Sequence, residues 1–145
     1  MREIDDFLKS WDEDSLEVKA VFSELYDFLR GALEKKQNLS LDWKARPNVS
    51  YSLRLLAGKA TAEGATATGQ ACIAMLDIID DDPEDRWLSL YLDAELAKDP
   101  DGRGDLAPRA LDGRDALCFD IDENDEDIVA YLTQVLEQTI LKAKI

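Results

Sequence analysis

Between Ala71 and Leu96, two segments with alternating apolar side chains flank an acidic turn, and this pattern constrains the fold more than any other feature of the chain. Alternation with a period of two is typical of β-strands that bury one face. The turn, residues 80–85, is rich in aspartate and contains Pro83. We therefore predict a central β-hairpin. Its shared apolar face is expected to hold Cys72, Ala74, Leu76, Ile78, Leu88, Leu90, Leu92 and Ala94.

The register of this hairpin follows from matching the two apolar sets. We expect Leu76 to lie opposite Leu88, which sets Asp77 opposite Trp87. When the apolar residues of both strands share one face of the hairpin, the opposite face carries a mixture of polar and apolar side chains. The residues expected on that second face are Ile73, Met75, Asp77, Trp87, Ser89, Tyr91 and Asp93.

Apolar residues at helical spacing predict helices before and after the strands. A short amphipathic segment covers residues 4–11, and a long helix follows it to about residue 37. A second long helix follows the acidic segment 122–127 and continues to the end of the chain. Side chains that accept hydrogen bonds from free backbone N–H groups are favoured at helix starts. The candidate caps are Asp14 or Ser15 for the first long helix and Asp122 or Asn124 for the second.

Three further strands are predicted from alternation over residues 39–45, 49–57 and 117–121, and the first two form a second hairpin. We expect a loop over residues 58–70, which are small and polar. The glycines and prolines between Lys98 and Asp115 predict an irregular excursion without any regular element.

The order helix, two strands, two strands, one strand, helix indicates an α+β fold. We expect a two-layer structure in which an antiparallel five-stranded sheet is covered on one face by the N- and C-terminal helices. A chain of 145 residues is long enough for one domain with a single core, so residues 1–145 are interpreted as one domain.

The charge balance excludes several classes of partner. The chain carries 32 acidic and 17 basic residues, a formal net charge of −15, and such a chain has few cations with which to bind a nucleic-acid backbone. It also lacks a secretory segment and any apolar run long enough to cross a membrane. We therefore expect a cytoplasmic protein that binds neither nucleic acid nor membrane.

No metal or cofactor is predicted. The chain has no histidine and only two cysteines, Cys72 and Cys118, which lack zinc-ligand spacing and are expected to pack as small buried side chains. The segments 99–105 and 120–124 begin like calcium-binding loops, but residues unsuited to ligation occupy later ligand positions. Turn formation and helix capping explain both segments.

A cluster of basic residues stands out against the acidic background. Residues 43–62 contain no Asp or Glu but include Lys44, Arg46, Arg54 and Lys59. The strand phases place the first three on the helix-free face, where guanidinium groups could hold a carboxylate or phosphate. Pairing of these side chains with nearby aspartates is the alternative.

The helix-free face also carries more apolar surface than a solvated sheet usually exposes, including Trp87 and Tyr91. Either the segment 98–115 covers it or it binds a partner. Asp77 and Asp93 lie on the same face, so an enzyme that uses one of them as an acid or base is a further alternative.

Four segments, Ser50–Arg54, Asp80–Trp87, Asp99–Asp105 and Cys118–Asp122 with the helix that follows, resemble a family of small bacterial domains of unknown function. The resemblance covers about residues 39–140. It implies the same helix, antiparallel sheet, helix layout and a bacterial origin, and it implies no activity, cofactor or site residue.

We interpret the chain as a non-enzymatic binding domain whose helix-free face takes an anionic small molecule, an acidic peptide or a second copy of the chain. A small enzyme with an acid or base Asp under the segment 98–115 is one alternative, and a chaperone-like partner of another protein is a second. The predicted surface residues are Lys44, Arg46, Arg54, Asp77, Trp87, Tyr91 and Asp93.

Overall fold

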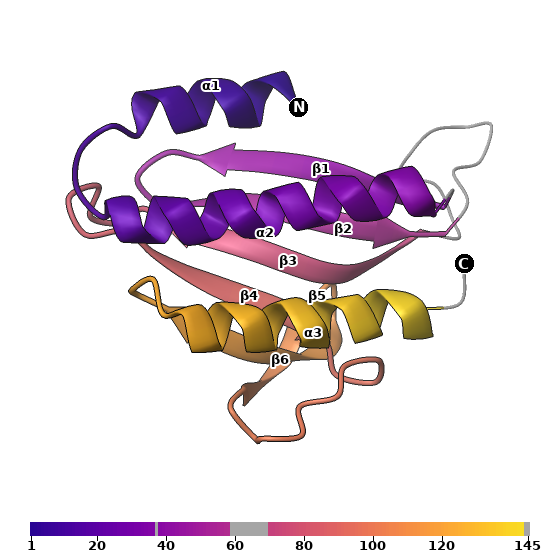
Figure 1. The fold of residues 1–145 in the computed structure, drawn as a ribbon. Coiled ribbons are helices and arrows are strands. Elements are labelled where there is room, and N and C mark those ends of the chain that lie inside the picture. The colour runs from indigo at the N-terminus through magenta and orange to yellow at the C-terminus, as the bar shows by residue number, and fades with distance from the viewer. Residues whose placement is uncertain (37, 59–69, 144–145) are drawn as a thin grey trace.

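The computed structural model describes residues 1–36, 38–58 and 70–143. It contains a six-stranded antiparallel sheet in the order β1-β2-β3-β4-β6-β5 and three helices (Figure 1), which confirms the α+β class. Most of the predicted 58–70 loop and Lys59 of the basic cluster lie outside the described residues. The elements are α1 (Arg2–Ser10), α2 (Leu16–Lys35), β1 (Leu39–Arg46), β2 (Ser50–Ala57), β3 (Ala71–Ile79), β4 (Trp87–Asp93), β5 (Asp105–Leu111), β6 (Arg114–Ile121) and α3 (Glu126–Lys142).

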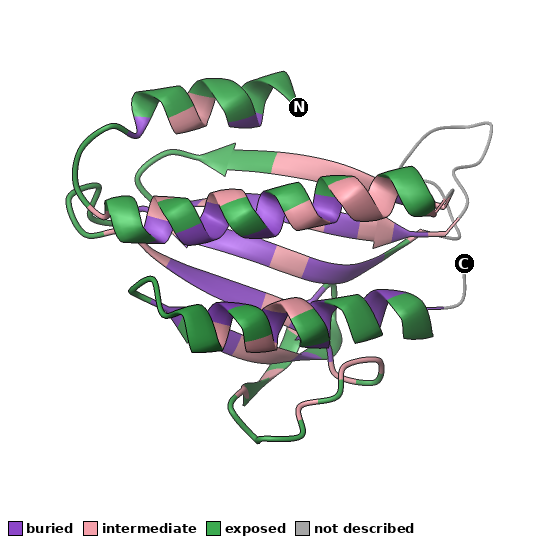
Figure 2. Ribbon diagram, in the orientation of Figure 1, coloured by how far each residue is buried: buried purple, intermediate pink, exposed green. Residues whose placement is uncertain are grey.

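The two long helices cover one face of the sheet, as predicted, and their buried stripes face the strands (Figures 1 and 2). Leu88, Leu90 and Leu92 of β4 are fully buried beneath them. Burial of each such side chain stabilises the fold by about 1.5–3 kcal/mol relative to exposure, which fixes which face the helices cover. The helix residues in this core are Val18, Val21, Phe22, Leu25, Leu29, Val129, Leu132, Val135, Leu136 and Ile140.

The predicted strand count of five is wrong, because β5 forms within the segment 98–115. β5 is an edge strand that pairs only with β6 among the described strands, and its pairing is shifted between Ala107 and Leu111. Within this shift lie Pro108 and Arg109, whose φ is +61°. A proline and an irregular pairing are tolerated at a sheet edge, so the breakers bend the strand without abolishing it.

The predicted register of the central hairpin is wrong by two residues. Leu76 lies opposite Leu90, and Leu88 lies opposite Ile78. A shift of two leaves every side chain on its predicted face, because side chains alternate with a period of two. Asp77 consequently lies opposite Ser89 instead of Trp87.

A β-bulge corrects the faces of two further residues. The register between β2 and β3 shifts after Leu55, so that Ile73 becomes the extra residue. Ile73 therefore turns into the main core, whereas Cys72 faces the helix-free side and packs with Leu111 and Ala116. The sequence pattern predicted the reverse placement of Ile73 and Cys72.

The helix caps also differ in detail. Ser15 precedes α2 as predicted, but its φ is +57° and its side chain does not cap the helix. The Ser15 hydroxyl instead accepts a hydrogen bond from the backbone N–H of Arg86 at 3.0 Å. Asp125, which was not among the predicted caps, accepts from the N–H of Asp127 at the start of α3.

The helix α1 packs beside the first hairpin, on the side of the sheet that carries the other helices (Figure 1). Phe7 contacts Trp43 and Tyr51, with ring centroids 5.8 and 4.1 Å away. Arg86 lies over the rings of Phe7 and Trp11, and its Nε donates to Asp80 at 2.7 Å. These contacts join α1 to the turn between β3 and β4.

Candidate functional site

The face of the sheet opposite α2 and α3, here called the open face, is organised in rows that cross the strands. The register between neighbouring strands defines three adjacent rows, and six of the seven predicted surface residues lie in them. The first row is Arg46, Ser50, Ile79 and Trp87; the second is Lys44, Ser52, Asp77, Ser89 and Asp120; the third is Asp42, Arg54, Met75, Tyr91 and Cys118.

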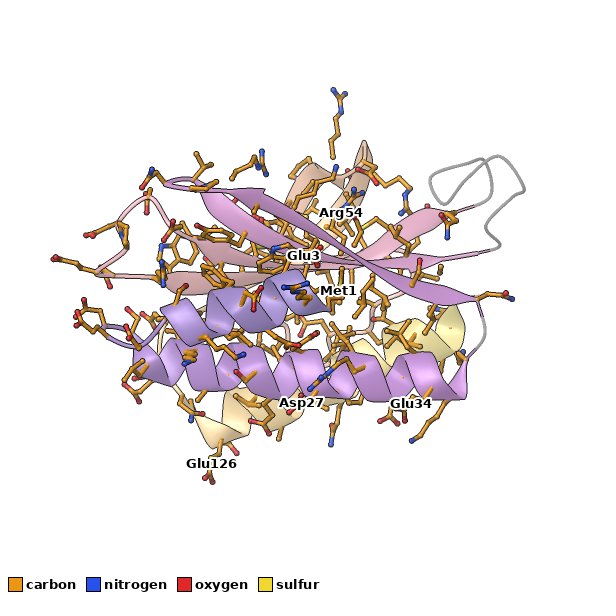
Figure 3. The ribbon with its side chains drawn as sticks, turned by 90° about the horizontal axis from the view of Figure 1, so that it is seen from above. Met1, Glu3, Asp27, Glu34, Arg54 and Glu126 are labelled. Carbon is orange, nitrogen blue, oxygen red and sulfur yellow. The ribbon has the colours of Figure 1, made fainter. Side chains whose placement is uncertain are left out.

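The tip of the β5–β6 hairpin, residues 111–114, lies on the open face beside the third row. Arg54 Nη2 donates to the carboxylate of Asp112 at 2.5 Å, and Figure 3 shows Arg54 on the side of the sheet away from α2. Arg114 donates to the carboxylate of Asp93 and to the carbonyl oxygen of Cys72. The segment 98–115 therefore covers part of the open face, which was one of the two expected alternatives.

Two aspartates hold Arg54, so the predicted basic cluster is partly neutralised within the chain. Besides Asp112, the Asp42 carboxylate lies 3.7 Å from Arg54 Nη1, and the Arg54 side chain is only 13% exposed. For Arg54, the structure therefore shows the expected alternative, in which a basic residue of the cluster pairs with nearby aspartates. Lys44 and Arg46 remain exposed, and neither forms an ion pair within the described part of the chain.

The second row contains a buried carboxylate. Ser52, Asp77 and Ser89 are 1%, 7% and 2% exposed although they face away from the helices. The Ser52 hydroxyl donates to Asp77, and Ser89 Oγ donates to Asp120 at 2.7 Å. Burial raises the pKa of Asp77, and the hydrogen bond from Ser52 and the charge of Arg46 oppose this only in part. Asp77 has no ion-pair partner among the described residues.

The first row combines a cation with an aromatic ring. Arg46 is exposed at one end, whereas Ile79 and Trp87 are half-buried at the other. Three inter-strand spacings of about 4.8 Å separate β1 from β4, so the backbones at Arg46 and Trp87 are roughly 14 Å apart. The β5–β6 tip makes its side-chain hydrogen bonds to Arg54, Asp93 and Cys72, none of which belongs to this row.

The two cysteines are poor nucleophiles. Burial raises the pKa of the Cys72 thiol. Burial, followed by the nearby Asp120, raises the pKa of Cys118 to about 11. Both thiols therefore stay protonated at neutral pH, and the thiol is far less reactive than the thiolate. Cys118 is half-buried on the open face, so the expectation that both cysteines are buried is right only for Cys72.

The acidic loop before β5 has a structural explanation. The Asp99 carboxylate accepts hydrogen bonds from the backbone N–H groups of Gly104 and Arg103, at 2.8 and 3.0 Å, and from the Tyr131 hydroxyl. This agrees with turn formation. Over residues 1–36, 38–58 and 70–143, no group of three or more His, Cys, Asp or Glu side chains is placed to hold a metal ion.

The sequence pattern did not reveal a hollow between the C-terminal halves of α2 and α3. Its volume is about 370 Å³, and apolar side chains including Phe28 and Ile140 line it. Gly31 also lines it, and a Cβ atom added there would meet no atom within 4 Å. The available signal in the sequence was a glycine in the middle of a predicted helix, because glycine lowers helix stability relative to alanine.

None of the described helices is long and apolar enough to cross a membrane. No family model, curated protein or solved structure matches the chain. The resemblance to a bacterial domain family therefore stays a prediction.

Proposed function

We propose that this chain is a non-enzymatic binding domain that takes a short acidic peptide across the first row of the open face. The observation that carries the proposal is the placement of Arg46 and Trp87 in one cross-strand row, away from the contacts of the β5–β6 tip. The arginine at one end of this row can bind a carboxylate. The isoleucine and tryptophan at the other end can pack against an apolar side chain.

The distance between the two ends favours an extended peptide over a small anion. An extended chain rises about 3.3 Å per residue, so about four residues span the roughly 14 Å between Arg46 and Trp87. The acidic end of such a peptide would pair with Arg46 and the neighbouring Lys44, both exposed. Its apolar end would pack on Trp87 and Ile79.

The first row is a better site than the neighbourhood of Arg54. A ligand carboxylate at Arg54 would have to displace Asp112 or Asp42, which already bond to it. Arg46 has no such competitor among the described residues. The open side chain therefore gains a charge-assisted hydrogen bond without losing one.

A titration with a synthetic pentapeptide tests the proposal. The probe carries two glutamates at its N-terminus and a phenylalanine at its C-terminus, and binding is followed by amide chemical shifts of the full chain. We expect saturable shifts along the first row, and a loss of affinity of at least about tenfold in Arg46→Gln and in Trp87→Ala. Arg109→Gln removes an exposed arginine of β5 and is the matched control, with unchanged affinity expected.

Three results would contradict the peptide site. They are chemical shifts that do not saturate, equal losses of peptide affinity in Arg46→Gln and Arg109→Gln, and tight binding of free glutamate or phosphate, neither of which has an aromatic group. The last result would support a small anionic ligand instead. Shifts at Ile79 and Trp87, on β3 and β4, that depend on protein concentration without peptide would support self-association through the open face.

The raised pKa of Asp77 favours acid–base catalysis as a second candidate function, because perturbed carboxyl groups are common in active sites. Asp93 fits this role less well, because it is held by Arg114. Asp77→Asn separates the two candidates. The binding proposal expects the variant to keep its affinity for the pentapeptide, whereas an enzyme would lose turnover of its substrate.

A further inference from the structure

The strand β1 is the outer edge of the sheet, and its backbone is regular over all eight residues. It pairs only with β2 among the described strands, and its register has no shift. Such an edge presents backbone N–H and C=O groups to a further strand unless it is protected.

The alternation of hydrogen bonds shows which residues face outward. The N–H of Gly58 donates to the carbonyl oxygen of Asn38 at 2.9 Å, one pair before Leu39 and Ala57. In an antiparallel ladder, hydrogen-bonded and non-hydrogen-bonded pairs alternate. Asp42 and Lys44 therefore turn their backbone groups toward β2, whereas Leu41, Trp43 and Ala45 turn theirs to the outer edge of the described sheet.

The side chains of this edge complement a second copy of the same strand. Ser40, Asp42, Lys44 and Arg46 alternate on the open face. An antiparallel pairing about Trp43 sets Asp42 opposite the partner's Lys44 and, by symmetry, Lys44 opposite the partner's Asp42. Pairing about Asp42 or about Lys44 instead sets one of these charges opposite itself, which is destabilising.

We infer that two copies of the chain associate through β1, antiparallel about Trp43, so that the sheet continues from one copy into the other. Trp43 then forms a hydrogen-bonded pair with the partner's Trp43, and Leu41 forms one with the partner's Ala45. The charged residues occupy the non-hydrogen-bonded pairs, in which side chains approach most closely. This interface is isologous, as a twofold dimer requires.

The interface has to accommodate α1. α1 lies along the outer side of β1, beside the half that ends at Arg46 (Figure 1), where Phe7 packs on Tyr51, the neighbour of Ala45. A twofold axis through Trp43 carries the second α1 to the opposite end of the interface. The two α1 helices therefore do not meet at the same half of the strand.

Lysines on edge strands commonly prevent sheet association, and Lys44 and Arg46 would repel a basic strand. Here Asp42 lies next to Lys44 on the same face of β1, so an identical antiparallel strand places an aspartate opposite each Lys44 and attracts it. The inference does not rest on the proposed peptide site, because the dimer uses the backbone edge of β1 whereas the peptide site uses side chains of the open face. In the dimer, Arg46 lies opposite the partner's Ser40.

Sedimentation velocity of the full chain over micromolar to millimolar concentrations tests the inference. An edge-to-edge interface is small, so we expect a weak, concentration-dependent dimer. An ionic strength of about 0.15 M, where the Debye length is about 8 Å, screens the repulsion between the two acidic chains more than it screens contacting pairs.

Two charge variants give the discriminating result. Lys44→Glu and Asp42→Lys each place like charges opposite one another, and each is expected to weaken self-association by about tenfold. An equimolar mixture of the two restores opposite charges in both pairs, so it should form a heterodimer as tightly as the natural chain forms its homodimer. Restored association also shows that both variants are folded, although Asp42 lies 3.7 Å from Arg54.

A backbone variant tests the hydrogen bonds. Ala45→Pro removes an outward-facing N–H without removing a bond to β2, and should abolish the dimer. Ala45→Ser keeps the N–H and should leave the dimer intact. A monomer at millimolar concentration, unchanged association in Ala45→Pro, or a mixture of the charge variants that stays monomeric would overturn the inference.

Discussion

The guanidinium of Arg54 in β2 donates to the carboxylate of Asp112, 58 residues further along the chain, and this contact joins the tip of the β5–β6 hairpin to the open face. On the same tip, Arg114 bonds to Asp93 of β4. The two ion pairs differ in burial, because the Asp112 side chain is 59% exposed whereas Asp93 is buried. Because of this difference, we expect removal of the two ion pairs to destabilise the fold by different amounts.

Asp112→Asn is expected to lower the free energy of unfolding by no more than about 0.5 kcal/mol, because solvent screens an exposed ion pair. Arg54 keeps Asp42 as a partner at 3.7 Å. Urea denaturation is the suitable measurement, since urea carries no charge and leaves ion pairs unscreened. Asp81→Asn, which alters an exposed turn carboxylate with no ion pair among the described residues, is the control. A loss above about 1.5 kcal/mol would show that the tip is held mainly by this pair.

Arg114→Met is expected to cost more, about 2 kcal/mol, because it leaves a buried carboxylate without its cation. Asp93 retains one hydrogen bond, from the N–H of Glu95 at 2.9 Å, which limits the loss. The carbonyl oxygen of Cys72 also loses the hydrogen bond from Arg114. The same urea series measures the effect, with Arg109→Met as the control at an exposed arginine of β5. Equal losses in the two variants would contradict this account of Asp93.

The sequence pattern was sufficient for the class of fold and for the buried face of the central strands. Leu88, Leu90 and Leu92 are buried as predicted because an error of two residues in register keeps side chains on their faces. Bulges are different, since one extra residue reverses the alternation. The exchange of Ile73 and Cys72 between faces has no signal in the alternation of β3 itself.

The candidate site was predicted in part. Alternation placed Arg46 and Trp87 on one face, but it could not show that Asp112 reaches Arg54, because that contact depends on a strand formed despite Pro108. The burial of Asp77 also could not be predicted from the sequence, since it depends on neighbours from three strands. Long-range pairing of this kind is decided by packing and by strand order, which local sequence does not encode.

Gly31→Ala is expected to stabilise the chain by about 0.5–1 kcal/mol, because alanine restricts the unfolded chain and favours the helix more than glycine does. Nothing in the structure opposes the change, since the added methyl group would meet no atom within 4 Å. Thermal unfolding measures it as a higher Tm. Gly102→Ala is the contrasting variant: its φ of +63° strains any other residue, so a lower Tm is expected. A lower Tm in Gly31→Ala would indicate that the hollow between α2 and α3 closes in solution.

Asp77→Asn is expected to raise stability at neutral pH and to lose this advantage in acid. Burial raises the pKa of Asp77, so the folded chain binds this proton more readily than the unfolded chain does. The ionised carboxylate therefore destabilises the fold above the raised pKa. As the pH falls through that pKa, Asp77 becomes protonated and the cost disappears.

Asparagine keeps an oxygen that can accept the hydrogen bond from Ser52 while it removes the charge. The measurement is the difference in urea midpoint between Asp77→Asn and the natural chain from neutral pH to about pH 4, near the pKa of an ordinary carboxyl group. Asp85→Asn, at an exposed turn carboxylate, controls for the change in net charge. If Asp77→Asn were less stable than the natural chain at neutral pH, the buried carboxylate would be stabilising the sheet, and the case for Asp77 as a perturbed, acid–base-competent group would fail.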